Sequence, residues 1–136
     1  MAIESTVLIV KPDGVRRRLI GEVLRRVEEA GLTIEDVRME TIAADTADEH
    51  YAEHREKPFF AELVTFITGG PAVVAKVTGE DAIARWRELM GPTDPKDAPP
   101  GTIRGDFASV ITENVVHGSD SPESAARELK LFFPDA

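Results

Sequence analysis

The sequence contains no cysteine among its 136 residues. Disulfide bonds and thiolate metal sites are therefore excluded. Long hydrophobic runs are also missing, since none approaches the ~18 residues that a transmembrane helix requires. The first residues lack the basic region and the apolar core of a signal peptide. These absences predict a protein that does not enter membranes and that resides in the cytoplasm.

Positive charge is scarce as well. The chain has 16 lysines and arginines against 25 aspartates and glutamates, which gives a formal net charge of −9. This balance argues against non-specific binding of nucleic acids, which needs clustered positive charge. It does not exclude an anionic ligand, because charges are screened over about 8–10 Å and a few basic groups can dominate a cleft. With 42% hydrophobic and 30% charged residues, the composition is that of a single globular domain over residues 1–136.

Apolar residues recur with the periods of strands and helices along most of the chain. Continuous apolar runs predict buried strands, and apolar positions three and four apart predict amphipathic helices. A change of parity at Glu35-Asp36 indicates a bulge. A capping-box pattern at Thr46 predicts the start of a helix that ends before Pro58. The other expected elements are strands at residues 5–10, 32–43, 72–78 and 115–116, and helices at residues 15–30, 59–68, 80–90 and 123–131.

This order of elements fits an α+β domain. It predicts a ferredoxin-like β-α-β-β-α-β core, in which helices pack on an antiparallel sheet. Residues 91–113 show little regular pattern and are rich in proline and glycine. Long structureless segments in small domains are generally functional or disordered, but Ile103 and Phe107 give this one apolar anchors. We expect an ordered loop that presents Thr93 and Arg104.

One histidine, His117, lies between a short apolar run and the start of a helix. Gly118 permits a tight turn, and Ser121 is a favourable N-cap with Pro122 at the first helical position. His117 is therefore expected near the positive end of a helix, where an anion is stabilised. A neutral imidazole there could attack a phosphorus atom. The alternative is a loop histidine that is merely solvated or hydrogen-bonded.

Other candidates have two possible interpretations each. Lys11 follows the first strand, so it is either a functional residue or a surface lysine. His50 and His54 share a helix face and could bind a metal, but Tyr51 stands where a metalloprotease has glutamate and no third ligand is evident. Glu128 lies either at the edge of a buried helix face or toward solvent. No Walker or Gly-x-Gly-x-x-Gly pattern is present, so phosphates would be bound by side chains.

Several blocks together resemble the signatures of nucleoside diphosphate kinases. The resemblance runs in order from about residue 5 to residue 133. The blocks that carry it are residues 10–15 (VKPDGV), 50–54 (HYAEH), 57–60 (KPFF), 100–107 (PGTIRGDF) and 114–121 (NVVHGSDS).

The resemblance implies roles for individual residues. His117 matches the histidine that is phosphorylated, and Ser119 and Glu128 match residues that support it. The implied catalytic set is His117, Lys11, Tyr51, Asn114, Ser119 and Glu128. The implied phosphate ligands are Lys11, Tyr51, His54, Arg87, Thr93 and Arg104. The implied ribose contacts are Lys11 and Asn114, and the implied apolar clamp on the base is Phe59 and Ile111.

The resemblance also implies an activity and partners. Such enzymes transfer the terminal phosphate of ATP or another nucleoside triphosphate to a nucleoside diphosphate by a ping-pong mechanism. They use Mg²⁺, which the nucleotide phosphates carry, with no metal ligands from the protein. A homo-oligomer is implied, either a hexamer or a tetramer. The alternative is a non-catalytic nucleotide-binding regulatory module of ferredoxin-like fold, which would bind ATP without exchanging phosphate.

Overall fold

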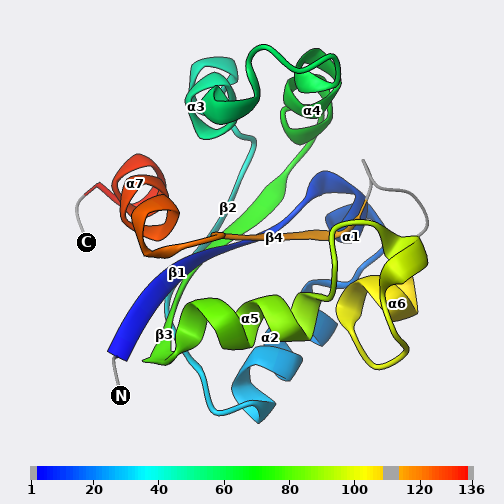
Figure 1. Ribbon diagram of the computed structural model, residues 1–136, viewed down its shortest axis with the longest axis vertical. Coiled ribbons are helices and arrows are strands. Elements are labelled where there is room, and N and C mark those ends of the chain that lie inside the picture. The colour runs from blue at the N-terminus through cyan, green and yellow to red at the C-terminus, as the bar shows by residue number, and fades with distance from the viewer. Residues whose placement is uncertain (1–2, 109–113, 135–136) are drawn as a thin grey trace.

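The computed structural model describes residues 3–108 and 114–134. A four-stranded antiparallel sheet forms its centre, with the strand order β2-β3-β1-β4 (Figure 1). The strands are β1 (Ile3–Val10), β2 (Thr33–Glu40), β3 (Ala72–Glu80) and β4 (Val116–Gly118). This confirms the expected α+β, ferredoxin-like sheet. None of the helices in the described part of the chain is long and apolar enough to span a bilayer.

The central strand β1 is buried on both faces, as its apolar run predicts. Because side chains alternate along a strand, Leu8 and Val10 contribute to one core, and Val7 and Ile9 contribute to the other. The first core is completed by helices α2 (Ile20–Glu29) and α5 (Ala82–Met90), including the fully buried Trp86. The second is completed by α3 (Ala44–His50), α4 (Phe60–Ile67) and α7 (Pro122–Phe132).

The edge strand β2 contains the bulge that the change of parity predicts. Its register against β3 shifts between Ile34 and Asp36. After the bulge, Val37 and Met39 are about half exposed, with 47% and 55% of their surface accessible. An edge strand with exposed apolar side chains is a surface that favours association.

The single helix predicted over residues 15–30 is wrong in its extent. The structure has a short helix α1 (Pro12–Arg16), followed by a separate helix α2. Arg18 between them adopts a left-handed conformation with φ of 63°, which a continuous helix cannot contain. Pro12 starts α1 earlier than expected because proline is favoured at the first helical positions. Gly31, with φ of 86°, follows the end of α2 in the left-handed conformation that glycine adopts readily.

The capping box expected at Thr46 is also wrong. Helix α3 begins three residues earlier, its N-cap is Ala43 instead of Thr46, and no side chain caps it. The Ala43 carbonyl accepts the first helical hydrogen bond from Ala47, which places Thr46 inside the helix. A short 3₁₀ helix η1 (Ala52–His54) follows. Helix α5 starts later than predicted because β3 continues to Glu80.

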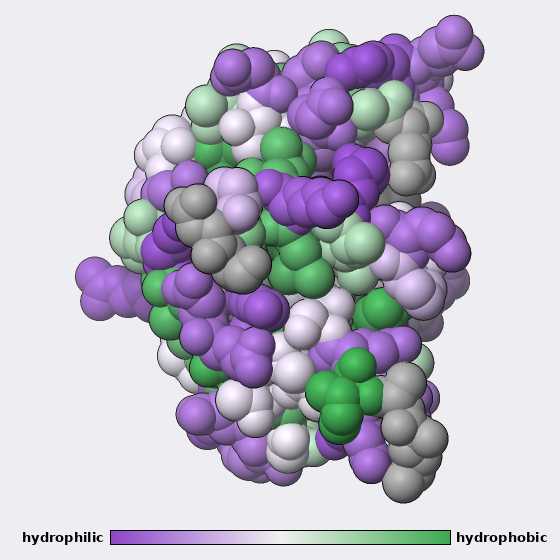
Figure 2. All heavy atoms as spheres, turned by 90° about the vertical axis from the view of Figure 1, so that its left-hand side faces the viewer, coloured by the Kyte–Doolittle hydropathy of each residue, from purple (hydrophilic) through white to green (hydrophobic). Residues whose placement is uncertain are grey.

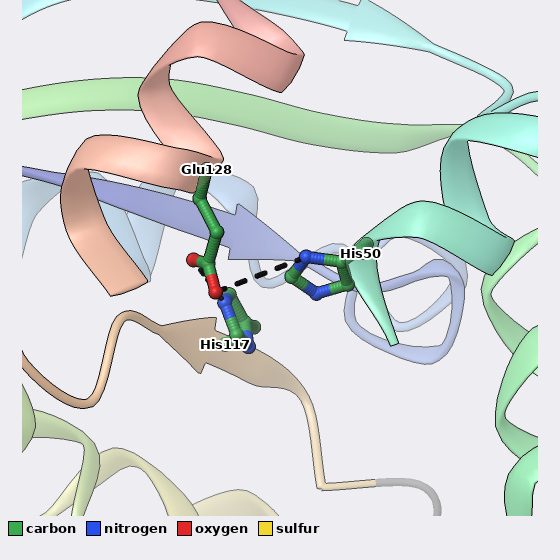
Figure 3. Close-up of side chains that lie close together, drawn as sticks. All are labelled: His50, His117 and Glu128. Carbon is green, nitrogen blue, oxygen red and sulfur yellow. Dashed lines mark hydrogen bonds and ion pairs between the residues drawn. The ribbon is translucent and has the colours of Figure 1, made fainter. Parts of the chain in front are cut away.

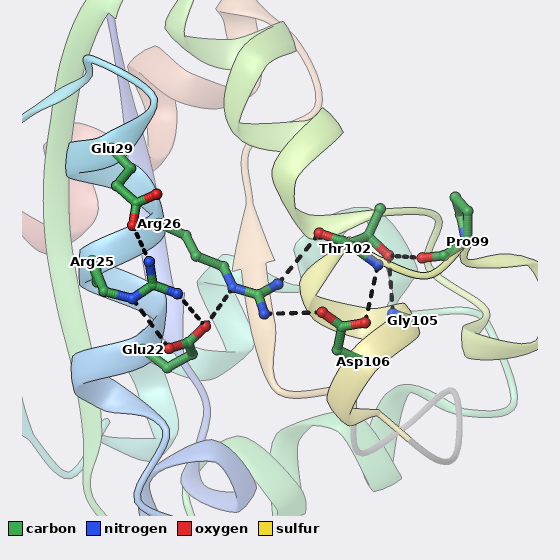
Figure 4. A network of polar contacts seen from close by, with 9 residues as sticks. Glu22, Arg25, Arg26, Glu29, Pro99, Thr102, Gly105 and Asp106 are labelled. Atoms are coloured by element: carbon green, nitrogen blue, oxygen red, sulfur yellow. Dashed lines mark hydrogen bonds and ion pairs between the residues drawn. The ribbon is translucent and has the colours of Figure 1, made fainter.

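The loop after α5 is more regular than the sequence predicts. It contains a 3₁₀ helix η2 (Pro95–Asp97) and a helix α6 (Ile103–Phe107), which Thr102 caps by accepting a hydrogen bond from the Gly105 amide. Figure 4 shows how the loop is attached to α2: the Arg26 guanidinium donates to the Asp106 carboxylate at 2.9 Å. These contacts order the described part of the loop, as expected. Ser121 caps α7 as predicted, through the Ser124 amide.

Candidate active site

A pocket of about 960 Å³ opens beside β4. Its walls come from the end of β1, from α3, η1 and the start of α4, from α5 and the loop that follows it, and from α7. Its volume lies at the upper end of the range that small-molecule and cofactor sites occupy. Residues distant in the sequence therefore meet around a space large enough for a nucleotide.

His117 is held rigidly in the wall of this pocket. Its backbone pairs with Ile9 of β1, and its carbonyl accepts a hydrogen bond from the Trp86 indole at 3.2 Å. Its ring Nε2 lies 2.8 Å from Glu128 Oε1 (Figure 3). Ser119 Oγ donates to the same oxygen at 2.8 Å. Within the described part of the chain, Nδ1 of His117 has no hydrogen-bond partner.

The charge on Glu128 determines which nitrogen of His117 carries the proton. Glu128 is buried, with 3% of its surface exposed, so it does not face solvent. Burial acts to raise the pKa of this carboxyl, but the hydrogen bond from His117, the electrostatic attraction of the two imidazoles His117 and His50, and the hydrogen bond from Ser119 outweigh it and lower the pKa to about 2. An ionised carboxylate accepts hydrogen bonds only. Nε2 of His117 must therefore donate, so the nucleophilic form of the ring has its lone pair on Nδ1.

His50 is a member of this cluster that the sequence did not identify as such. Its ring centroid lies 4.5 Å from that of His117 in an edge-to-face arrangement, and its Nδ1 lies 3.9 Å from Glu128 Oε2. Burial is the largest cause that lowers the pKa of His50 well below its ordinary value, so its ring is neutral. The spacing to His54 suggested a pair on one helix face, but His54 lies beside Tyr51 and Phe59 instead.

Lys11 is not the surface lysine of the alternative interpretation. Only 6% of its surface is exposed, and its Nζ donates to Asn114 Oδ1 at 2.9 Å. The amide of Asn114 in turn donates to the Thr93 carbonyl at 3.0 Å. Burial and, to a smaller extent, the nearby Arg104 lower the pKa of Lys11 to about 8, against an ordinary value of 10.5. A negatively charged ligand in the pocket would therefore stabilise the charged form of this lysine.

Arg104 is fixed by backbone carbonyls from both sides of the pocket. Its guanidinium donates to the carbonyls of Gly91 and Val116 at 2.9 and 2.8 Å, and more weakly to that of Asn114 at 3.4 Å. Burial and the neighbouring Arg87 lower its pKa to about 10, so it stays charged at neutral pH. Arg87 donates to the Asp120 carbonyl at 3.3 Å. Arg87, Arg104 and Lys11 therefore line one pocket, which Arg127 also lines.

The outer part of the pocket is aromatic. Phe59 is 39% exposed, and its ring lies 5.7 Å from that of His54. Tyr51 lies deeper, and burial raises the pKa of its hydroxyl, which stays protonated. Ile111, the other predicted contact with a base, lies outside the described residues.

Val115 holds a strained conformation between Asn114 and His117. Its φ is 74°, which is an outlier for a β-branched residue. Asp13 Oδ2 accepts a hydrogen bond from the Val115 amide at 3.1 Å, and the Val115 carbonyl accepts one from the Lys11 amide at 2.8 Å. Both bonds come from the segment that follows β1. They fix the backbone between Asn114 and His117, which both line the pocket. Asp13 was not predicted as a site residue.

Comparison with known proteins identifies the family of this chain. A model of the nucleoside diphosphate kinase family matches residues 4–136. The chain belongs to this family. It is 62% identical over 130 residues to the nucleoside diphosphate kinase of Rubrobacter xylanophilus, covering 96% of this chain and 98% of that protein. The corresponding protein of Deinococcus radiodurans is 56% identical over 132 residues, covering 97% and 96% of the two chains.

Solved structures of nucleoside diphosphate kinases share the fold. That of Aquifex aeolicus superposes with a TM-score of 0.94 at 44% identity, covering 97% of this chain and 96% of that one. A halophilic enzyme from Halobacterium salinarum, solved in complex with CDP, has a TM-score of 0.95 at 47% identity, covering 98% and 90%. The family membership of this chain therefore rests on both sequence and fold.

The residues predicted for a nucleoside diphosphate kinase site converge in the structure. With two exceptions, every one of them lines the pocket. Ser119 is fully buried behind Glu128, and Ile111 lies outside the described residues. Their individual roles in substrate binding and catalysis stay predictions.

The donor chemistry of the pocket does not suit a magnesium ion held by the protein alone. Among the described residues, the only close group of three histidine or acidic side chains is His50, His117 and Glu128. Two of its three ligands are nitrogens, whereas Mg²⁺ prefers oxygen ligands and bridges substrate phosphates in enzymes of this kind.

Proposed function

We propose that this chain transfers the γ-phosphate of a nucleoside triphosphate to a nucleoside diphosphate through a phosphohistidine at His117. The observation that supports this most directly is the orientation of the ring. Nε2 is bound to the ionised Glu128, and Nδ1 is left without a partner in the described structure, in a pocket that also contains Lys11, Arg87 and Arg104. A nucleophile and the groups that neutralise phosphate charge thus share one cavity.

In the first half-reaction, the lone pair on Nδ1 of His117 attacks the γ-phosphorus. The N–P bond forms as the bond from phosphorus to the β–γ bridging oxygen breaks, and the nucleoside diphosphate leaves with that electron pair. The ring becomes positively charged, and the Glu128 carboxylate at 2.8 Å stabilises it. A second nucleoside diphosphate then accepts the phosphoryl group by the reverse step. Because both half-reactions use one pocket, the kinetics are ping-pong.

The substrate in this scheme is the nucleotide with its bound divalent ion, for which we propose Mg²⁺. Phosphoryl transfer depends mainly on positioning and on neutralising the charge of the equatorial oxygens. Lys11, Arg87 and Arg104 supply fixed positive charge, and the hydroxyls of Tyr51 and Thr93 offer further hydrogen bonds. His54 completes the predicted phosphate contacts.

The nucleoside part would be held with little discrimination among bases. The buried pair of Lys11 and Asn114 would bind the ribose hydroxyls. The exposed ring of Phe59 would stack on the base, and stacking accepts any nucleobase because each has a π-face. Ile111 is expected to cover the other face of the base.

The proposal is tested by incubating the protein with ATP that carries labelled γ-phosphate. We expect acid-labile label on the wild-type chain, its release on adding a different nucleoside diphosphate, and no label on His117→Ala. Label that persists in His117→Ala would overturn the assignment of the nucleophile. Tight binding of ATP without any exchange would favour the regulatory module instead.

We further infer that the chain forms one domain that assembles into a homo-oligomer, a hexamer or a tetramer. Support comes from β2, which lies at the edge of the sheet and exposes Val37 and Met39. Figure 2 shows that apolar side chains also gather in patches among polar ones on the face that carries α7. Light scattering of the purified protein gives the mass that distinguishes monomer, tetramer and hexamer. The cytoplasmic location stays a prediction.

A further inference from the structure

One buried side chain in the pocket has no role in the proposed reaction. His50 is 4% exposed, and neither of its ring nitrogens has a hydrogen-bond partner within the described structure. A buried polar group without a partner costs free energy, so its presence calls for an explanation. The ring faces the two groups that matter most for catalysis, His117 and Glu128, as Figure 3 shows.

We propose that His50, His117 and Glu128 form a binding site for one transition-metal ion of the Zn²⁺ type, and that the ion inactivates His117. Each residue offers one ligand atom, and these atoms all lie within 4.8 Å of one another. Two imidazoles and one carboxylate with an open position are the ligand set of many zinc sites. The remaining position faces the pocket, where water or a phosphate oxygen can bind.

The distances require only small adjustments to receive the ion. Zn²⁺ bonds of about 2.0–2.1 Å place tetrahedral ligand atoms about 3.3 Å apart. With Glu128 Oε1 as the ligand, its separation of 2.8 Å from His117 Nε2 must widen, and the His50 ring, whose Nδ1 lies 3.9 Å from the other carboxylate oxygen, Oε2, must turn toward Oε1. Both changes lie within reach of side-chain rotation. Arg127 Nη2, at 3.7 Å from Glu128 Oε2, competes with the ion and makes the affinity moderate.

Two of the three ligands, His50 and Glu128, are already in the protonation states that a metal ion needs. Histidine binds metals as a neutral ring and carboxyls bind them ionised. The lowered pKa of His50, caused mainly by its burial, keeps its ring neutral. The pKa of Glu128, lowered to about 2 by its hydrogen bonds and the two imidazoles against the effect of burial, keeps it ionised. The site discriminates against Mg²⁺ because nitrogen ligands suit zinc and related ions.

Binding of the ion removes the nucleophile without occupying Nδ1. The metal takes the lone pair at Nε2 of His117, so the proton that resided there moves through pocket water to Nδ1. The ring stays neutral overall, but Nδ1 now carries a hydrogen and has no lone pair for phosphorus. Glu128 is also withdrawn from its role as hydrogen-bond acceptor. This consequence rests on the proposed phosphohistidine mechanism, whereas the binding of the ion does not.

Metal binding is tested first, without nucleotide. The chain contains three histidines and no cysteine, so its nitrogen ligands can be removed one at a time. Calorimetric titration of the metal-free protein with zinc sulfate should give one ion per chain. His50→Gln should weaken binding at least tenfold, and His54→Gln, which removes a histidine outside the cluster, should change it less than twofold. Equal binding by wild-type and His50→Gln, or no binding, would overturn the proposal.

A spectroscopic titration protects this test against a variant that folds poorly. Co²⁺ in a tetrahedral site of nitrogen and oxygen ligands absorbs strongly in the visible range, and the wild-type protein should show this band. The band should vanish on adding one equivalent of Zn²⁺. An octahedral Co²⁺ spectrum would mean that the three side chains do not share the ion and would refute the site.

Inhibition is tested separately with the phosphohistidine label. Zn²⁺ added before ATP should reduce labelling of the wild-type and His54→Gln proteins, each relative to its own rate without zinc. His50→Gln should need at least tenfold more zinc for the same loss. Zinc that merely chelates ATP would inhibit all three proteins equally, which contradicts the proposal. If no protein is labelled even without zinc, the phosphohistidine mechanism fails, while the calorimetric result on metal binding still holds.

Discussion

Burying the charged Lys11 lowers the free energy of unfolding of the wild-type protein, and this destabilisation depends on pH. Replacing Lys11 with methionine should remove it. Burial, together with Arg104, lowers the pKa of Lys11 from 10.5 to about 8 in the folded protein. Between these two pH values the unfolded chain binds a proton at this lysine and the folded chain does not. Stability rises with pH wherever the unfolded state binds more protons. The wild-type protein should therefore gain stability at this residue between about pH 8 and pH 10.5.

The size of the effect follows from the same two pKa values. They differ by about 2.5 pH units, and each unit corresponds to 1.36 kcal/mol, so the lysine contributes a change of about 3 kcal/mol. Below about pH 8 the lysine is charged in both states, so the destabilisation caused by its burial is complete and does not vary with pH. Above pH 10.5 the lysine is neutral in both states and the cost is gone.

Urea denaturation of wild-type and Lys11→Met proteins between pH 7 and pH 10.5 measures this directly. The difference in unfolding free energy should shift by about 3 kcal/mol in favour of the wild-type as the pH rises. The exposed Lys96→Met variant controls for the loss of one positive charge. A difference between wild-type and Lys11→Met that does not vary with pH would refute the argument. Lys11→Met should also lower turnover more than about tenfold, because a phosphate contact is lost.

Three further substitutions test other parts of the site. Arg104→Ala removes hydrogen bonds to three carbonyls and should lower turnover more than about tenfold in the exchange assay; a near-normal rate would contradict its assigned role. Gly118→Ala places a Cβ within 2.6 Å of Trp86 and Met90. It should lower the free energy of unfolding, measured by urea denaturation, by about 1–3 kcal/mol. Unchanged stability would show that the pocket wall is packed less tightly than described. Asp13→Ala leaves the Val115 amide unpaired and should cost about 1–3 kcal/mol, whereas Asp13→Asn, which keeps an acceptor oxygen, should cost less; equal effects would rule out this hydrogen bond as the cause.

Features set by neighbouring residues were predictable from the sequence. The alternation along β1 places Leu8 and Ile9 in different cores because side-chain direction depends only on position in the strand. The bulge near Asp36 follows from a change of parity in the apolar pattern. Ser121 caps α7 because its hydroxyl reaches the Ser124 amide three residues later. None of these features needs a distant part of the chain.

Features set by distant contacts were not predictable in this way. One local feature was missed as well: the helix break at Arg18 is accompanied by a bond from the Leu19 amide to the Gly14 carbonyl, which the apolar periodicity does not encode. Helix α6 forms within a loop that is attached to α2 through Arg26. His50 could be paired with His54 from spacing, but its contact with His117 depends on how α3 packs against the sheet. The site residues themselves were found through the family resemblance rather than through periodicity.

The turn after β1, which comprises Lys11 and the start of α1, has two roles that the sequence alone does not distinguish. It supplies a side chain to the pocket, and it fixes the backbone of Val115. Lys11 lines the pocket with its side chain and binds the Val115 carbonyl with its backbone amide. Asp13, two residues later, binds the Val115 amide with its carboxylate. A β-branched residue at positive φ is held only where its surroundings over-determine it, and these two bonds supply that constraint. The turn therefore acts on His117 indirectly as well, since the strained residue it holds sets the direction in which β4 enters the pocket wall.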